Sequence, residues 1–149
     1  MGFSKIYKFV KNYFYEYDAL NRLRVATSKA GLTTGGYNEW LSYDKNGNIL
    51  TLNRTGINPF LNQSTDIDAL TYSYDTGNKL LAVTDSKLKN EGFTEPENQG
   101  TTNDYTYDTF GNLTSDNNKK ITNIRYNHLN LPLKITFSGT NKFIEYLYR

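Results

Sequence analysis

Short stretches in which apolar and polar residues alternate cover most of the chain, and turn-forming residues separate them. Tyr72 and Tyr74 lie two positions apart, as do Tyr105 and Tyr107. A period of two is typical of half-buried β-strands. The pattern predicts about eleven short strands. The best defined are expected near residues 37–43, 48–53, 69–75, 79–84, 103–108, 121–126 and 132–137.

Within this pattern a Tyr-Asp pair followed by a turn recurs along the chain. It lies in segments 15–23, 41–49, 72–80, 105–113 and 124–132, and a further copy begins at Tyr146. Self-similarity of this kind indicates a repeat architecture. We therefore expect a lead segment over residues 1–12 and a repeat region over 13–149, with about five hairpin units and a truncated sixth.

The motif follows turn chemistry. Asp at the first turn position accepts backbone N–H groups, and Gly at the fourth position tolerates the left-handed conformation. Asn, which also tolerates positive φ, replaces Gly at Asn21 and Asn130. Gly77 is one position closer to its Asp, which predicts a tighter turn there. The structural motif residues are Tyr17, Asp18, Tyr43, Asp44, Gly47, Tyr74, Asp75, Gly77, Tyr107, Asp108, Gly111, Tyr126, Asn127 and Asn130.

Each unit is then a β-hairpin, and consecutive hairpins can pair side by side. The predicted fold is all-β: tandem antiparallel hairpins forming one curved, twisted sheet strip, roughly 50 Å wide. The connectors 27–36, 54–68 and 85–104 are long and polar, so we expect them to be loops. Residues 87–100 are expected to be disordered.

Composition supports a strand-rich fold and excludes several functions. Tyr is abundant, at 13 residues against 8 Phe and one Trp, and there is no Cys. Disulfides, thiol nucleophiles and Cys-based zinc sites are therefore excluded. A net charge of +2 does not indicate the strongly basic surface that binds nucleic acid. No apolar run reaches the length of a membrane span, and no signal-peptide core is present.

Candidate chemistry is sparse. The single His, His128, lies in a turn without suitably spaced partners. Residues 44–48 resemble a calcium loop, but Ile49 and Thr55 stand where that loop needs Gly and Glu. The paired carboxylates near residues 66–68 and 95–97 lack an apolar pocket signal. We therefore expect no catalytic, cofactor-binding or metal-binding residues, and no enzyme.

Exposed aromatic residues are the one candidate binding feature. Tyr37, Trp40 and Tyr43 could stack against sugar rings on one sheet face. The alternative is ordinary cross-strand packing, which is the common role of Tyr in strands.

The repeated Tyr-Asp-x-x-Gly-Asn-Leu core, preceded by Tyr-x-Tyr-Asp, resembles the Rhs/YD-repeat family. The best local matches are residues 105–113 and 43–49, and the resemblance covers residues 13–149. It implies a β-sheet ribbon that spirals into a hollow shell, as in bacterial polymorphic toxins, insecticidal toxin complexes and teneurins. The bacterial shells enclose a C-terminal toxin domain, and some family members are described as carbohydrate-binding surface proteins.

From this resemblance we expect a structural shell segment without catalysis, in a protein that is secreted or at a bacterial cell surface. The alternative is a carbohydrate-binding cell-surface module that uses an aromatic sheet face. The expected partners are neighbouring YD repeats, a toxin cargo domain, or glycan. Open edges at the first and last strands predict self-association.

Overall fold

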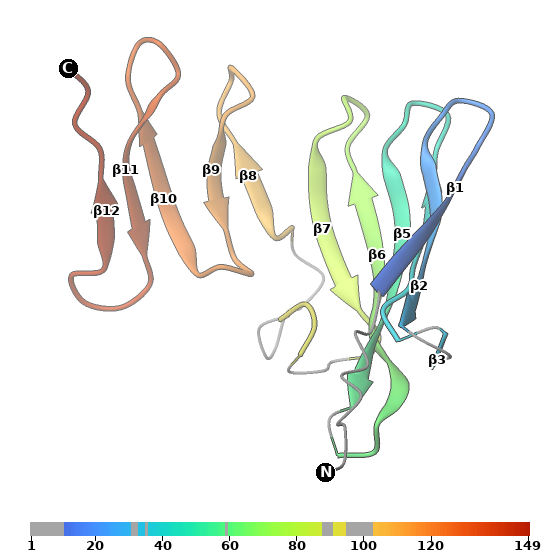
Figure 1. Ribbon diagram of the computed structural model, residues 1–149. Helices are drawn as coiled ribbons and strands as arrows, with labels where there is room; N and C mark the ends of the chain where they lie inside the picture. Colours follow the sequence, from blue (N-terminus) through green and yellow to red (C-terminus); the bar gives the residue numbers. More distant parts are fainter. Residues whose placement is uncertain (1–10, 31–32, 35, 59, 88–90, 95–102) are drawn as a thin grey trace. The chain divides into compact units, whose positions relative to one another are not determined.

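The computed structural model describes residues 11–149 except 31, 32, 35, 59, 88–90 and 95–102. The described residues form strands and turns without a helix (Figure 1), which confirms the all-β prediction. The strands are β1 (Lys11–Tyr17), β2 (Leu23–Ala30), β3 (Thr33–Thr34), β4 (Glu39–Tyr43), β5 (Ile49–Asn58), β6 (Gln63–Tyr74), β7 (Leu80–Asp85), β8 (Tyr105–Tyr107), β9 (Leu113–Asp116), β10 (Ile121–Tyr126), β11 (Pro132–Phe137) and β12 (Phe143–Glu145).

The chain divides into two compact units. The first comprises the residues up to Leu70 together with Ser86–Phe93. The second comprises Thr71–Asp85 together with the residues from Thr94 to Arg149. The lead segment expected over residues 1–12 lies outside the described residues except at its last two positions, which belong to β1.

The strands form two antiparallel sheets, whereas the sequence predicted one continuous strip. The seven-stranded sheet has the order β1-β2-β4-β5-β6-β7, with β3 paired to β2, and the five-stranded sheet has the order β12-β11-β10-β9-β8. In the second unit, Asp104 links β7 to the start of β8. Its N–H donates to the carbonyl oxygen of Leu81 at 2.7 Å, and its Oδ2 accepts the N–H of Val83 at 2.8 Å. These two hydrogen bonds of Asp104, one from its main chain and one to its side chain, take the place of a regular ladder between β7 and β8.

The prediction of a loop over residues 54–68 was wrong. Strands β5 and β6 extend through most of this range and are joined by a turn that ends at Asn62, which has a φ of 48°. The charged residues at the two ends of this range neutralise each other, because Arg54 forms an ion pair with the fully buried carboxylate of Asp68. The loop predicted over 27–36 was likewise wrong in part, since β2 continues to Ala30.

The expected disorder of residues 87–100 was wrong for the part that the structure describes. Lys87 forms an ion pair with Asp66 at 2.8 Å, and the N–H of Phe93 donates to Oδ1 of Asp68. Gly92 is required at its position, because a Cβ there would overlap the Asp68 carboxylate. Residues 88–90 and 95–100 lie outside the described residues.

The five motif turns share one set of backbone hydrogen bonds. In each, the N–H of the first Asx residue donates to the carbonyl four residues later, and the N–H of the fourth turn residue donates back to the Asx carbonyl. The Asx Oδ1 also accepts the N–H groups two and four positions on. The fourth residue of each turn has a positive φ: Asn21, Gly47, Asn78, Gly111 and Asn130.

This set includes the turn at Asp75, where the sequence predicted a shorter loop. The residue with positive φ is Asn78, at 66°, and not Gly77. Asn carries its own local hydrogen-bonding side chain and tolerates the left-handed region. The turn therefore has the same length as the others, and Gly77 occupies its unconstrained third position.

A β-bulge lies beside four of these turns, and its extra residue is on the strand that follows the turn. The strand register shifts immediately before Tyr17, Tyr43, Tyr107 and Tyr126. Each of these tyrosines is thereby paired with the residue six positions later in its own hairpin. A bulge bends the strand and re-aims the side chain at its end.

The apolar core is small for the number of strands. The buried hydrophobic residues of the described chain are Ala26, Leu70, Val83, Tyr105, Ile121 and Ile124. Four carboxylates are equally buried: Asp68, Asp85, Asp104 and Asp116. Since burying a polar group is favourable only when it is hydrogen-bonded, much of the cohesion between strands rests on polar contacts.

The two glycines at different turn positions test this geometry. Gly111→Ala is expected to lower the free energy of unfolding by about 1 kcal/mol, since a φ of 89° is unfavourable for a residue with a Cβ. Gly77→Ala is expected to cost clearly less, because its Cβ would make only an ordinary 3.4 Å contact with Asp75. Urea denaturation of both variants measures the difference, and Gly111→Asn serves as the tolerated control. An equal loss at the two glycines would contradict the assignment of Asn78.

Candidate functional site

Motif tyrosines connect consecutive hairpins through a hydrogen bond from their hydroxyl groups. In four hairpins the tyrosine Oη donates to a backbone carbonyl of the hairpin before it; we call each such contact a tyrosine joint. The acceptor is always the residue six positions after the preceding motif tyrosine, the first residue of the strand that follows the turn. The joints are Tyr43 to Leu23 (2.7 Å), Tyr107 to Leu80 (2.9 Å), Tyr126 to Leu113 (2.8 Å) and Tyr148 to Pro132 (2.7 Å).

At two joints a cation also covers the tyrosine ring. The Arg22 guanidinium lies 4.7 Å from the Tyr43 ring centroid, and the Lys79 ammonium lies 5.6 Å from that of Tyr107. In both cases the cation comes from the residue immediately before the acceptor carbonyl. Cation–π contacts of this geometry are attractive. The tyrosine is thus held at its hydroxyl and at its face by two adjacent residues.

Arg22 is itself positioned by the turns on either side. Its Nε donates to Oδ2 of Asp18 at 2.7 Å, and its Nη1 donates to the carbonyl oxygen of Asp44 at 2.8 Å. The backbone N–H of Arg22, followed by its side chain, holds the pKa of the Asp18 carboxyl below its ordinary value. The first two turns are therefore joined by an arginine as well as by Tyr43.

The hydroxyls of Tyr107 and Tyr126 are protonated donors at neutral pH. Burial, followed by nearby negative groups, raises the pKa of the hydroxyls of Tyr107 and Tyr126 above the ordinary value of 10.0. A phenolate could not donate to a carbonyl, so the shift favours the form that makes the joint. In the adjacent turn, the Asn112 side-chain amide is the main cause that holds the pKa of Asp108 below its usual range.

The three tyrosine and tryptophan residues suggested for glycan stacking have different surroundings. The Tyr43 hydroxyl is used in a joint and its ring carries Arg22. Trp40 is 39% exposed and pairs across the sheet with Val25 and Asn53. Tyr37, which is half exposed, lines a groove that includes neither of the other two.

That groove lies on the first sheet between two walls of tyrosine. Its floor is the pair of small buried residues Ala26 and Ser28 of β2. Tyr15 lies opposite Ala26 and Tyr13 opposite Ser28, and their rings stack with centroids 6.2 Å apart. On the other side, the N–H of Tyr37 donates to the Ser28 hydroxyl at 2.7 Å. We call Tyr13, Tyr15 and Tyr37 with this floor the tyrosine groove.

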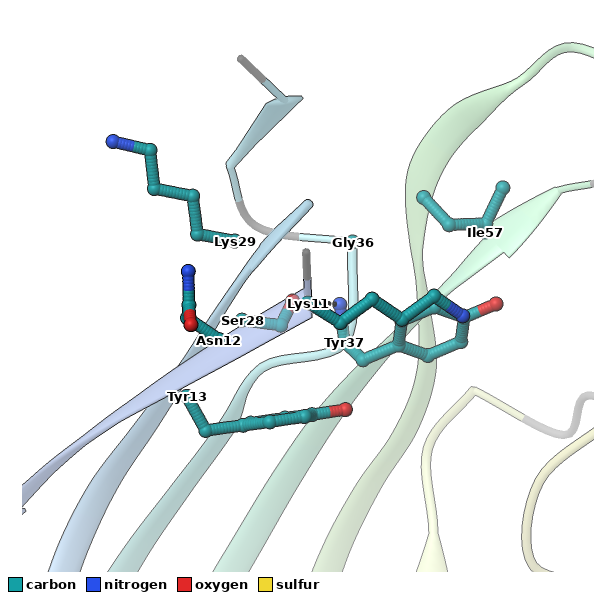
Figure 2. Close-up of a pocket in the computed structure, with 8 residues that line it drawn as sticks. All are labelled: Lys11, Asn12, Tyr13, Ser28, Lys29, Gly36, Tyr37 and Ile57. Carbon is teal, nitrogen blue, oxygen red and sulfur yellow. Dashed lines mark hydrogen bonds between the residues drawn. The ribbon is translucent and has the colours of Figure 1, made fainter. Parts of the chain in front are cut away.

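The groove widens from a narrow end to a polar end. At the narrow end, a pocket of about 60 Å³ is lined by residues that include Lys11, Tyr13, Tyr37 and Ile57 (Figure 2). Gly36 is needed there, because a Cβ would approach the Ile57 side chain to 2.8 Å. At the other end, a pocket of about 290 Å³ shares Tyr13 and Tyr37 and adds Tyr15, Asn38, Glu39, Arg54 and Thr55 among its lining residues.

This arrangement combines aromatic faces with hydrogen-bonding groups. Antiparallel neighbours lie about 4.8 Å apart, so walls on either side of β2 are separated by about 10 Å, which admits one ring-shaped ligand. Glu39 adds a polar group, while the Asn38 Oδ1 already accepts the N–H of Ser28 and Arg54 is paired with Asp68. The groove therefore has the width and the mixture of aromatic and polar groups that suit a ring with hydroxyl substituents.

His128 occupies the second position of the turn that begins at Asn127. It lines a pocket of about 450 Å³ together with Asp108 and Tyr126. The Asp108 carboxylate already accepts two backbone N–H groups and the Asn112 amide.

Among the described residues, no group of three or more His, Cys, Asp or Glu could hold a metal ion. The same residues include no helix long and apolar enough to cross a membrane.

No protein-family model and no curated protein matches this chain.

Sequence analysis missed both the joints and the groove. Each motif tyrosine was assigned to strand packing, although its fixed spacing from the residue after the turn was the available signal for a joint. For the groove, the alternation of Tyr13 and Tyr15 was visible, but its proximity to Tyr37 depends on pairing through Ser28. No short-range pattern reports that contact.

Removing one joint hydroxyl is expected to destabilise the protein. Tyr126→Phe keeps the ring but leaves the Leu113 carbonyl without its donor, at a cost of about 1 kcal/mol in the free energy of unfolding. Tyr13→Phe removes the hydroxyl of a half-exposed tyrosine that makes no joint, and is expected to be close to neutral. Chemical denaturation compares the two variants. Equal stability of Tyr126→Phe and the parent protein would show that the joint contributes nothing.

Proposed function

We propose that this chain is a wall segment of a YD-repeat β-shell, of the kind that encloses a C-terminal toxin domain in bacterial polymorphic toxins. Its role is to pair hairpin against hairpin, with no catalysis of its own. The observation that carries the proposal is the tyrosine joint, which repeats with one geometry at Tyr43, Tyr107, Tyr126 and Tyr148.

The use of the motif residues supports this role. The Asx carboxylates and amides satisfy their own turns, the tyrosine hydroxyls satisfy the preceding hairpin, and the cations lie on the tyrosine rings. None of these groups remains directed at a substrate. In a repeat protein each repeat contacts mainly its neighbours. Motif residues that bond to the neighbouring hairpin are therefore what a sheet needs if further repeats are to be added to it.

On this proposal the partners are other YD hairpins or a toxin cargo domain within a longer protein. The protein would act outside the cytoplasm, either secreted or at a bacterial cell surface. The chemistry of the joint sets the requirement for such a partner. It must present either a backbone carbonyl or a tyrosine hydroxyl at the sheet edge.

An extended variant tests the wall function. Replacing Arg149 by a copy of residues 127–137 would supply the turn and second strand that follow Tyr126, placed after Tyr148 instead. A wall segment accepts this added strand, so the urea midpoint is expected to rise. The matched control carries the same eleven residues in scrambled order. An extension that raises stability no more than its scrambled control would sink the proposal.

A second function is favoured by a separate observation, the tyrosine groove. We propose as an alternative that the chain is a carbohydrate-binding module that uses this aromatic sheet face. Tyr13, Tyr15 and Tyr37 supply ring faces, and Glu39 and Asn38 supply polar groups beside them. Amphipathic aromatic side chains next to a few polar groups are typical of ligand sites.

Tyr37 and Trp40, both suggested by the sequence for glycan stacking, give different predictions, because only Tyr37 lines the groove. Against a panel of neutral oligosaccharides, Tyr37→Ala is expected to weaken binding about tenfold, or about 1.4 kcal/mol. Trp40→Ala is expected to leave binding unchanged, because Trp40 does not line the groove. Isothermal titration calorimetry measures both, with circular dichroism as the check on folding. Binding that survives Tyr37→Ala, or no binding by the parent protein, excludes the groove as a glycan site.

A further inference from the structure

Among the described residues, strand β1 is the outer strand of the first sheet, and its joint is incomplete. Tyr17 lies opposite the same kind of β-bulge and precedes the same Asx turn as the tyrosines of the joints at Tyr43, Tyr107 and Tyr126. Its hydroxyl, however, has no acceptor within the part of the chain that the structure describes, and the residue is 59% exposed. All seven residues of β1 are exposed, although Tyr13, Phe14, Tyr15 and Tyr17 are large and apolar.

We propose that β1 pairs antiparallel with β1 of a second copy of this chain, about a two-fold axis at Phe14, and that Tyr17 completes its joint on the partner copy. This inference goes beyond the wall function, because it assigns a surface for self-association and a register.

The register follows from the joint at Tyr43. Val25 of β2 lies opposite Trp40 of β4, and continuing that ladder brings Arg22 opposite Tyr43. Arg22 covers the Tyr43 ring, and the next residue, Leu23, supplies the acceptor carbonyl. At this joint a cation therefore lies opposite the tyrosine, and the acceptor carbonyl belongs to the next residue.

Strand β1 carries this pair at its own beginning. With Phe14 opposite Phe14 of the second copy, Lys11 lies opposite Tyr17 and Asn12 follows it. Lys11 and Asn12 then take the places that Arg22 and Leu23 hold in the observed joint. The same order, a cation and then the acceptor, occurs at Lys79 and Leu80. The two-fold axis makes the contact twice, because each copy supplies both the donor and the acceptor.

The remaining pairs of this register are also compatible. Tyr13 lies opposite Tyr15 of the second copy, and Asn12 lies opposite Glu16, so no like charges face each other. Directly opposite side chains in an antiparallel pair share a face and interact. Phe14, 58% exposed in the single chain, is covered by its symmetry mate. At β12, the outer strand of the second sheet, the joint is already occupied, since Tyr148 donates to Pro132.

The chain has no Cys, so single cysteines report the register directly. Phe14→Cys is expected to form a disulfide-linked dimer under mild oxidation, because residues opposite each other in a strand pair are within reach. Glu16→Cys alone is expected to cross-link at least tenfold more slowly. An equimolar mixture of Asn12→Cys and Glu16→Cys is expected to cross-link at a rate comparable with Phe14→Cys.

Sedimentation velocity of the full chain gives the second measurement. The parent protein is expected to dimerise, and Tyr17→Phe is expected to raise the dimer dissociation constant at least fivefold while leaving the melting of the monomer unchanged. Ile144→Cys, on β12, reports self-association through the outer strand of the second sheet. A parent protein that stays monomeric at several hundred micromolar overturns the proposal, and so does faster cross-linking at Ile144 than at Phe14.

Discussion

The hydrogen bond from a tyrosine hydroxyl to a backbone carbonyl is the contact on which the order of the hairpins depends. Each hairpin closes through its own Asx turn, but that turn acts only within the hairpin. The joint at Tyr126, for example, ties the end of β10 to the first residue of β9. Because the apolar core is small, alignment of successive hairpins relies on such directed polar contacts more than on non-directional burial.

The turns and the joints are mutually dependent. A joint forms only if the tyrosine points toward the neighbouring strand, and the bulge opposite the tyrosine changes the local strand direction there. The turn also places the residue before the acceptor, which is why Arg22 and Lys79 reach the rings of Tyr43 and Tyr107. The Tyr-Asp pair therefore combines a contact between hairpins with a contact inside one.

Sequence reasoning succeeded where the determinant is local. The Asp44 turn and its Gly47 follow from side-chain hydrogen bonding and positive φ within five residues, and most strand positions followed from their alternation. It failed where the determinant lies across strands. Arg54 and Asp68 read as polar loop residues because their ion pair spans fourteen positions, and the tyrosine groove depends on pairing between β1, β2 and the segment at Tyr37. The turn at Gly77 was predicted one residue too short, because Asn78 can adopt the same positive-φ geometry as a glycine.

The acceptor in every joint is a main-chain oxygen, and this has a consequence for how such a chain can change over generations. Leu23, Leu80, Leu113 and Pro132 all serve, and even the proline does so without loss, because it retains its carbonyl group. A substitution at the accepting position keeps the main-chain carbonyl and therefore keeps the hydrogen bond. Any unit that keeps its tyrosine can then follow any other unit. Duplication, deletion or exchange of whole units within a gene can therefore preserve every tyrosine joint without compensating mutations.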